Sequence, residues 1–122
     1  PAFGLPPGPD ASYRNEEGFE ALVFGGRLYL GMEADNTLGA RLWRTRRADS
    51  PPLVQADWEE VIADARGLPF GLPDVAQNDH VDSLAAHDGW LYVSTANRSR
   101  APTGFRLFRS PAGGAGSWQA AD

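Results

Sequence analysis

Short runs of apolar residues, separated by polar or glycine-rich turns, dominate the chain. The first half holds four such runs, at residues 20–24, 27–32, 40–45 and 57–62. Gly25 and Gly26 separate the first two runs and can adopt the positive φ angles of a tight hairpin turn. The pattern predicts short antiparallel strands. Residues 58–66 have some helical propensity, but we expect a strand there.

The second half of the chain repeats the first. Four landmarks return in the same order: residues 3–6 in 70–73, 21–30 in 83–93, 41–45 in 106–110, and Trp58 in Trp118. Asp88 and Gly89 take the place of the glycine turn. The spacing between landmarks varies, as expected where loops accept insertions. We therefore expect one domain over residues 1–122, with repeat 1 at about 3–69 and repeat 2 at about 70–122.

A four-stranded sheet with apolar side chains on both faces needs neighbours that cover both faces. The radial stacking of β-propeller blades supplies that cover, and propellers use about 4 to 8 blades. Two four-stranded antiparallel blades per chain are too few to close. The sequence thus predicts an all-β chain of two propeller blades. Closure would come from self-assembly, most simply a homotrimer with six blades, or from further chain or other propeller subunits.

Several motifs resemble those of known propellers. Residues 83–86 (SLAA), 91–97 (LYVSTAN) and 43–45 (WRT) resemble a bacterial propeller repeat with "S-(L/M)-A-V-F-x-G-x-L-Y-V-G-T-x-N" and "W-R-(S/T)" motifs. Residues 110–118, and in a stretched form 45–58, resemble the Asp-box "S-x-D-x-G-x-x-W" of sialidase-like propellers. The resemblance implies a propeller fold and favours an extracytoplasmic location. It leaves function open, because such folds host lectins, hydrolases and scaffolds.

Composition excludes several classes of function. A net charge of -5 argues against a nucleic-acid partner, because phosphate contacts need a basic surface. The chain has no cysteine, which excludes disulfides and thiolate metal sites, and no lysine, which excludes Schiff bases and Walker-type phosphate loops. No apolar run approaches the roughly 18 residues of a membrane span. We expect no membrane span and no cofactor.

The best candidate ligand site follows the second predicted strand. Glu33, Asp35 and Asn36 could bind a cation or sugar hydroxyls, because an extended backbone puts both carboxylates on one side. The counterpart in the second repeat offers Asn97 and Arg98 but no acid, so the site would not repeat identically. The alternative is a solvated loop with Asx turns.

The matched aromatic and arginine positions suggest packing. Trp58 and Trp118 hold corresponding places, which predicts a structural role. Trp90 stands at a turn, and we expect it to be exposed and free to stack on a sugar ring. Arg44 and Arg109 also correspond, and we expect them to pair with acids between blades or to contact a ligand.

Neither catalysis nor a metal site is expected. Glu59 and Glu60 are adjacent on a predicted strand, so their side chains point to opposite faces and cannot act as a general acid and base pair. His80 and His87 flank Asp82, but no third ligand recurs at a recognisable spacing.

These features rank three functions. The first is a non-enzymatic binding or interaction module, with lectin-like carbohydrate binding as the leading subtype. The second is a structural subunit or fragment of a larger propeller assembly. The third is part of an Asp-box glycoside hydrolase whose catalytic residues come from several blades.

Overall fold

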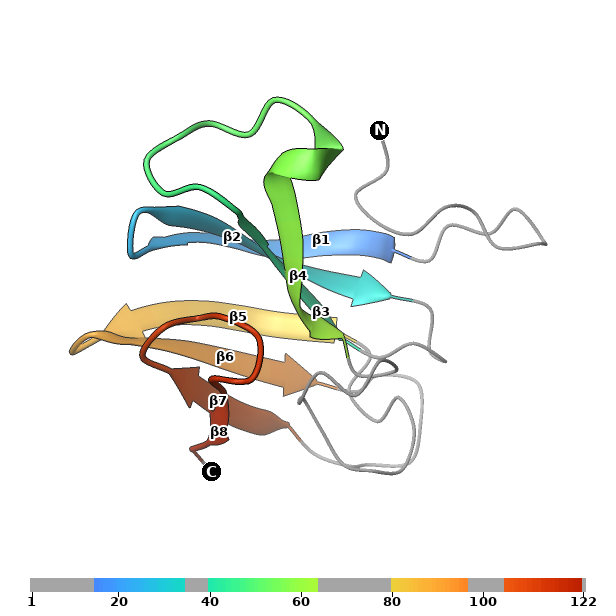
Figure 1. Ribbon diagram of the computed structural model, residues 1–122. Helices are drawn as coiled ribbons and strands as arrows, with labels where there is room; N and C mark the ends of the chain where they lie inside the picture. Colours follow the sequence, from blue (N-terminus) through green and yellow to red (C-terminus); the bar gives the residue numbers. More distant parts are fainter. Residues whose placement is uncertain (1–14, 35–39, 64–79, 97–104, 122) are drawn as a thin grey trace.

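The computed structural model describes residues 15–34, 40–63, 80–96 and 105–121 (Figure 1). The strands are β1 (Asn15–Phe24), β2 (Arg27–Ala34), β3 (Arg41–Thr45), β4 (Trp58–Ala63), β5 (His80–His87), β6 (Trp90–Ala96), β7 (Arg106–Ser110) and β8 (Gln119–Ala120). One 3-10 turn, η1 (Gln55–Asp57), stands directly before β4. Within these residues there is no α-helix, and the predicted all-β class is confirmed.

The strands form two antiparallel meanders. The first unit runs β1-β2-β3-β4 and the second runs β5-β6-β7-β8. The units are joined in one sheet by a single pair between β2 and β5, Glu33 with His80. Each half of the chain therefore contributes a four-stranded antiparallel meander, but the two meanders belong to one eight-stranded sheet and not to the two separate sheets that were predicted.

The two meanders share one strand register. Tyr29 on β2 pairs with Arg44 on β3, and at the same place in the second unit Tyr92 on β6 pairs with Arg109 on β7. The outer strands continue this match, because Arg44 pairs with Glu59 and Arg109 pairs with Gln119. Residues in corresponding places are called counterparts below.

A β-bulge also recurs. β1 leaves register twice, at Glu16 and Phe19, and β5 leaves register once, at Asp82, which is the counterpart of Phe19. A bulge bends its strand and increases the local twist, so both units are deformed at the same point. The sequence repeat is thus a repeat of backbone geometry.

Both predicted hairpin turns are confirmed. Gly25 and Gly26 have φ angles of 56° and 72°, and Asp88 and Gly89 have φ angles of 47° and 76°. Positive φ at both central positions matches the twist of the flanking strands.

The hydrophobic core lies between the two units. The buried side chains come from both: Tyr29, Ala40, Leu42, Val61, Ile62, Val81, Leu91, Val93, Phe108 and Trp118. The units approach most closely at Gly31, where an added Cβ would lie 2.5 Å from Cγ1 of Val81. Trp58 and Trp118 are both buried, as their matched positions predicted.

The element boundaries differ from the prediction in two places. β1 begins at Asn15 rather than residue 20, and η1 delays the start of the fourth strand to Trp58. The region considered for a helix is a strand over β4, and residues 64–66 lie outside the described residues.

The close approach at Gly31 yields a stability prediction. Gly31→Ala should lower the free energy of unfolding by about 1–3 kcal/mol, because the new methyl group overpacks the contact with Val81. Val81→Ala in the same chain should recover part of the loss. The free energy would be measured by urea unfolding.

Gly18→Ala is the matched control. Gly18 is exposed, and nothing lies within 4 Å of an added Cβ there. Equal losses for the Gly31 and Gly18 variants would contradict the packing described here.

Candidate functional site

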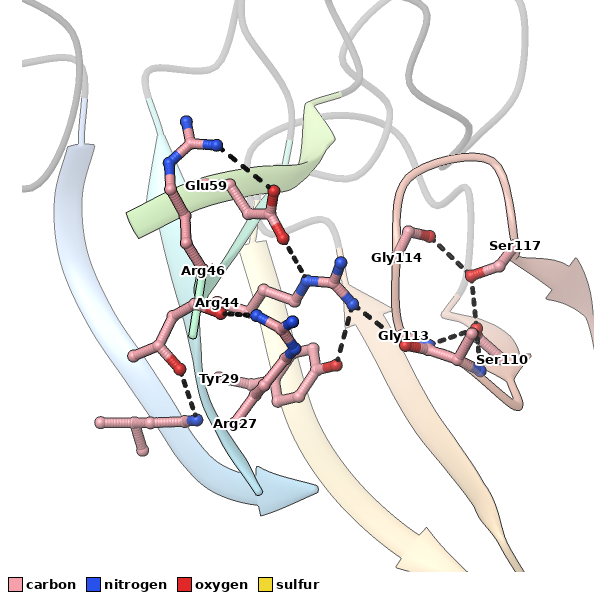
Figure 2. Close-up of polar contacts among 12 residues, drawn as sticks. Arg27, Tyr29, Arg44, Arg46, Glu59, Ser110, Gly113, Gly114 and Ser117 are labelled. Carbon is pink, nitrogen blue, oxygen red and sulfur yellow. Dashed lines mark hydrogen bonds and ion pairs between the residues drawn. The ribbon is translucent and has the colours of Figure 1, made fainter. Parts of the chain in front are cut away.

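Arg44 ties the two units together (Figure 2). Its Nε donates a hydrogen bond to Oε1 of Glu59 at 2.6 Å, and its Nη1 donates to the carbonyl oxygen of Ala112 at 3.0 Å. The same Nη1 lies 3.5 Å from the hydroxyl of Tyr29. Ala112 belongs to the loop between β7 and β8, so this guanidinium bridges the first unit and the second.

The Arg44 cluster stabilises the junction of the units. Burial disfavours the charge, but hydrogen bonds to Tyr29 and Glu59 outweigh it, and the pKa of Arg44 lies above its ordinary value. The prediction of an acid from a neighbouring blade is wrong, because Glu59 lies on β4 of the same unit. A backbone carbonyl crosses the junction instead.

The loop that resembles an Asp-box in the second unit is held by two serine hydroxyls (Figure 2). Oγ of Ser110 accepts hydrogen bonds from the backbone N–H groups of Ala112 at 3.2 Å and Gly113 at 2.7 Å. Ser117 donates from its hydroxyl to the carbonyl of Gly114 at 2.6 Å. The hydroxyl oxygens of the two serines are 2.6 Å apart. These hydroxyls fix the loop without any aspartate.

The corresponding loop of the first unit uses a carboxylate. Oδ2 of Asp57 accepts hydrogen bonds from the backbone N–H groups of Leu53 at 2.8 Å and Val54 at 3.0 Å. These bonds favour the ionised form and lower the pKa of Asp57. Asp57 directly precedes Trp58, and Ser117 directly precedes Trp118. In both loops, therefore, the side chain before the tryptophan forms hydrogen bonds with the loop backbone. Their polar groups serve the loop backbone and leave no evident ligand site.

The meander divides the molecule into two ends. The hairpin turns and the loops after β3 and β7 lie at one end, at the left of Figure 1, which we call the turn end. β2, β4 and β6 end, and β3, β5 and β7 begin, at the opposite end, which we call the connection end.

The predicted ligand residues do not form one site. Glu33 is half-buried at the connection end, whereas Trp90 begins β6 at the turn end. β6 extends from Trp90 to Ala96, which at the usual rise per residue is about 20 Å. The other four residues, Asp35, Asn36, Asn97 and Arg98, lie outside the described residues.

Trp90 is not a free aromatic platform. It is half-buried, and the guanidinium carbon of Arg109 lies 4.5 Å from the ring centroid. This cation–π contact covers one face of the indole. The expectation of an exposed Trp90 is therefore wrong for that face, and Arg109 has an aromatic partner where an acid was expected.

A polar cluster does occur at the connection end. His80 is buried there and pairs with Glu33 on one side and with Ala96 on the other. Its Nε2 lies 3.7 Å from Oδ1 of Asp82, whose side chain is 52% exposed. Asp82 is the bulged residue of β5, and bulges often re-aim side chains beside functional sites. One carboxylate, that of Asp82, thus lies near a buried imidazole, and Glu33 is the strand partner of the same histidine.

A buried ion pair lies on the neighbouring strands. Nη1 of Arg41 is 2.9 Å from Oε1 of Glu60, and both side chains are almost fully buried. Glu59 binds Arg44 instead. The two adjacent glutamates therefore engage different arginines, as expected if they cannot act as a catalytic pair. Burying a charge is costly unless it is paired, so the ion pair with Arg41 holds the Glu60 carboxylate in place.

Sequence reasoning considered Asp82 only with His80 and His87 as a metal site, which it set aside, and it missed the Arg41–Glu60 pair. The signal for Asp82 was its place one residue before the Ser83 that begins the repeated segment. Among the described residues, no group of three or more histidine, aspartate or glutamate side chains could hold a metal ion.

The role assigned to Arg44 can be tested by replacement. Arg44→Met should lower the free energy of unfolding by about 1–3 kcal/mol, because the Ala112 carbonyl loses its charged donor and Glu59 keeps only the exposed Arg46. Chemical denaturation would measure the loss.

Arg46→Met provides a control that touches the same glutamate. Arg46 lies 3.5 Å from Glu59 with a side chain that is 57% exposed, and such pairs contribute about 0–1 kcal/mol. A loss for Arg46→Met as large as that for Arg44→Met would refute the bridging role.

Comparisons with known proteins add no relative. No protein-family model, no curated protein and no solved structure matches the chain. In the part of the chain that the structure describes, there is also no helix with the length and apolar character needed to cross a membrane.

Proposed function

We propose that this chain is a non-enzymatic binding module made of two propeller-type units, and that it binds carbohydrate at its connection end. The observation that carries the proposal is the shared strand register of the two units, including the bulge at Asp82. A repeated scaffold of this kind brings the connections between its strands to one end, where ligand residues can gather.

The stacking of the units supports the propeller interpretation. Each unit is an antiparallel meander of four strands, and apolar side chains of both units share one core, although a β2–β5 pair also joins them in one sheet. Propeller blades have this strand order and this mode of packing.

The polar cluster at the connection end supports a hydroxyl-rich ligand. Glu33 and Asp82 provide carboxylate oxygens that can accept hydrogen bonds from sugar hydroxyls. His80 is buried beside them and holds its place on the strand. Carboxylates of this kind can bind a sugar by accepting hydrogen bonds, and such binding needs no catalytic nucleophile.

A purely structural role within a larger assembly is the second candidate. The Arg44 bridge and the two tied loops favour it, because their polar groups all serve to join or brace the units. A glycoside hydrolase is less well supported, since both Glu59 and Glu60 are engaged by arginines.

Binding to a panel of immobilised glycans tests the proposed function. We expect the unmodified chain to bind at least one glycan, and Asp82→Asn to weaken that binding about 10- to 100-fold, because a charge-assisted hydrogen bond is lost. Surface plasmon resonance would measure the affinity.

Asp88→Asn is the matched control at the turn end, where asparagine also tolerates the positive φ. It should leave binding unchanged, as should Trp90→Ala. Failure to bind any glycan, or equal effects of the two asparagine variants, would reject the carbohydrate proposal and favour the structural role.

A further inference from the structure

Counterpart residues of the two units differ in burial. Val93 and Phe108 of the second unit form a cross-strand pair that is buried against the first unit. Their counterparts, Leu30 and Trp43, form the same pair in the first unit but are only half-buried. The first unit therefore has a face, which we call the Leu30 face, that is the counterpart of a covered face; it is partly open at Leu30 and Trp43 and buried at Met32 and Arg41.

On the opposite face of each unit, the residues of the first unit are the more deeply buried ones. Tyr29 and Leu42 of the first unit are 1% and 0% exposed because they pack against the second unit. Their counterparts in the second unit, Tyr92 and Leu107, are half-buried. The second unit therefore has a partly open face, which we call the Tyr92 face, that is the counterpart of the other covered face.

The Leu30 face and the Tyr92 face correspond to the two faces that pack on each other inside the chain. Inside the chain, a face of the Tyr29 type packs on a face of the Val93 type. We propose that a second copy of this chain places its Leu30 face on the Tyr92 face of the first, and so repeats the internal contact between chains. This inference rests on the proposed function as a module of propeller-type units. It favours a second copy over a foreign partner because one chain carries both halves.

The sizes of the residues at the closest approach fit this arrangement. Inside the chain, Gly31 leaves room for the branched side chain of Val81. At the proposed contact, the counterpart of Gly31 is Ser94 and the counterpart of Val81 is Gly18. Ser94 takes the place of the internal glycine, and Gly18 takes the place of the internal valine. The summed volume of the two side chains therefore stays small. Gly18 has open space around it, and Ser94 is 9% exposed with its hydroxyl 2.8 Å from that of Ser83.

Arg44, which bridges the two units, also has a counterpart on the Tyr92 face. Arg109 is the counterpart of Arg44, which reaches the loop after β7. In the proposed contact Arg109 would face the corresponding loop of the next chain, residues 46–57. Among the described residues, its guanidinium lies over the ring of Trp90, and its Nε is buried without a hydrogen-bond partner.

A contact between two different faces is heterologous, so each added chain exposes the same faces again until a ring closes. Three chains would give six units, within the about 4 to 8 blades that closed propellers use. The predicted homotrimer agrees with this geometry and remains a proposal.

Cysteine cross-linking tests the contact directly, because the chain has no cysteine of its own. The internal pair has its Cβ positions, with one built on Gly31, 2.8 Å apart, close to the about 3.8 Å that a disulfide prefers. A chain with both Gly18→Cys and Ser94→Cys should therefore oxidise into covalent oligomers, with loss of the monomer band on a non-reducing gel. Reduction should restore that band.

Two controls define the outcome. Gly18→Cys with Ala115→Cys, an exposed position in the loop after β7, should stay monomeric on the gel. Leu30→Glu in the Gly18→Cys, Ser94→Cys background should abolish cross-linking, and circular dichroism would verify that each variant is folded. A folded Gly18→Cys, Ser94→Cys chain that stays monomeric after oxidation would overturn the contact. Glycan binding by that same chain would show that the module proposal survives without it.

Discussion

The packing of one β unit on the other is the interaction on which the rest of the structure depends. Each unit is a thin sheet with apolar residues on both faces, and short strands of this kind are not stable alone. Tyr29 and Leu42 from one unit and Val81 and Val93 from the other share a single core. Burial of each such side chain contributes about 1.5–3 kcal/mol, so the shared core is the main source of stability. Gly31 permits the close approach on which this core depends.

Polar groups refine that packing and do not replace it. Arg44 carries a charge into the junction and satisfies it with Glu59, Tyr29 and a carbonyl from the other unit. The tied loops at the turn end keep this carbonyl in place. The turn end is therefore committed to structure. The proposed ligand site lies at the connection end, beside Glu33 and Asp82.

Much of the fold could be predicted because local chemistry determines it. Gly25 and Gly26 mark a hairpin that few other residue pairs could form, and the repeated Leu-Tyr and Arg-Leu segments mark the paired strands. The partners of Arg44 and the position of Trp90 could not be predicted, because they depend on which end and which face each strand presents. The bulge at Asp82 was likewise hidden, since alternation of apolar residues does not reveal one extra residue in a strand.

The mass of the chain in solution tests the central claim most directly. In the proposed assembly, the Leu30 face and the Tyr92 face of each 13.2 kDa chain pack on neighbouring chains. Sedimentation equilibrium should therefore give a multiple of 13.2 kDa, with three chains favoured, that falls towards the single-chain mass when Leu30 is replaced by glutamate. A stable, folded species of 13.2 kDa at every concentration measured would contradict the claim.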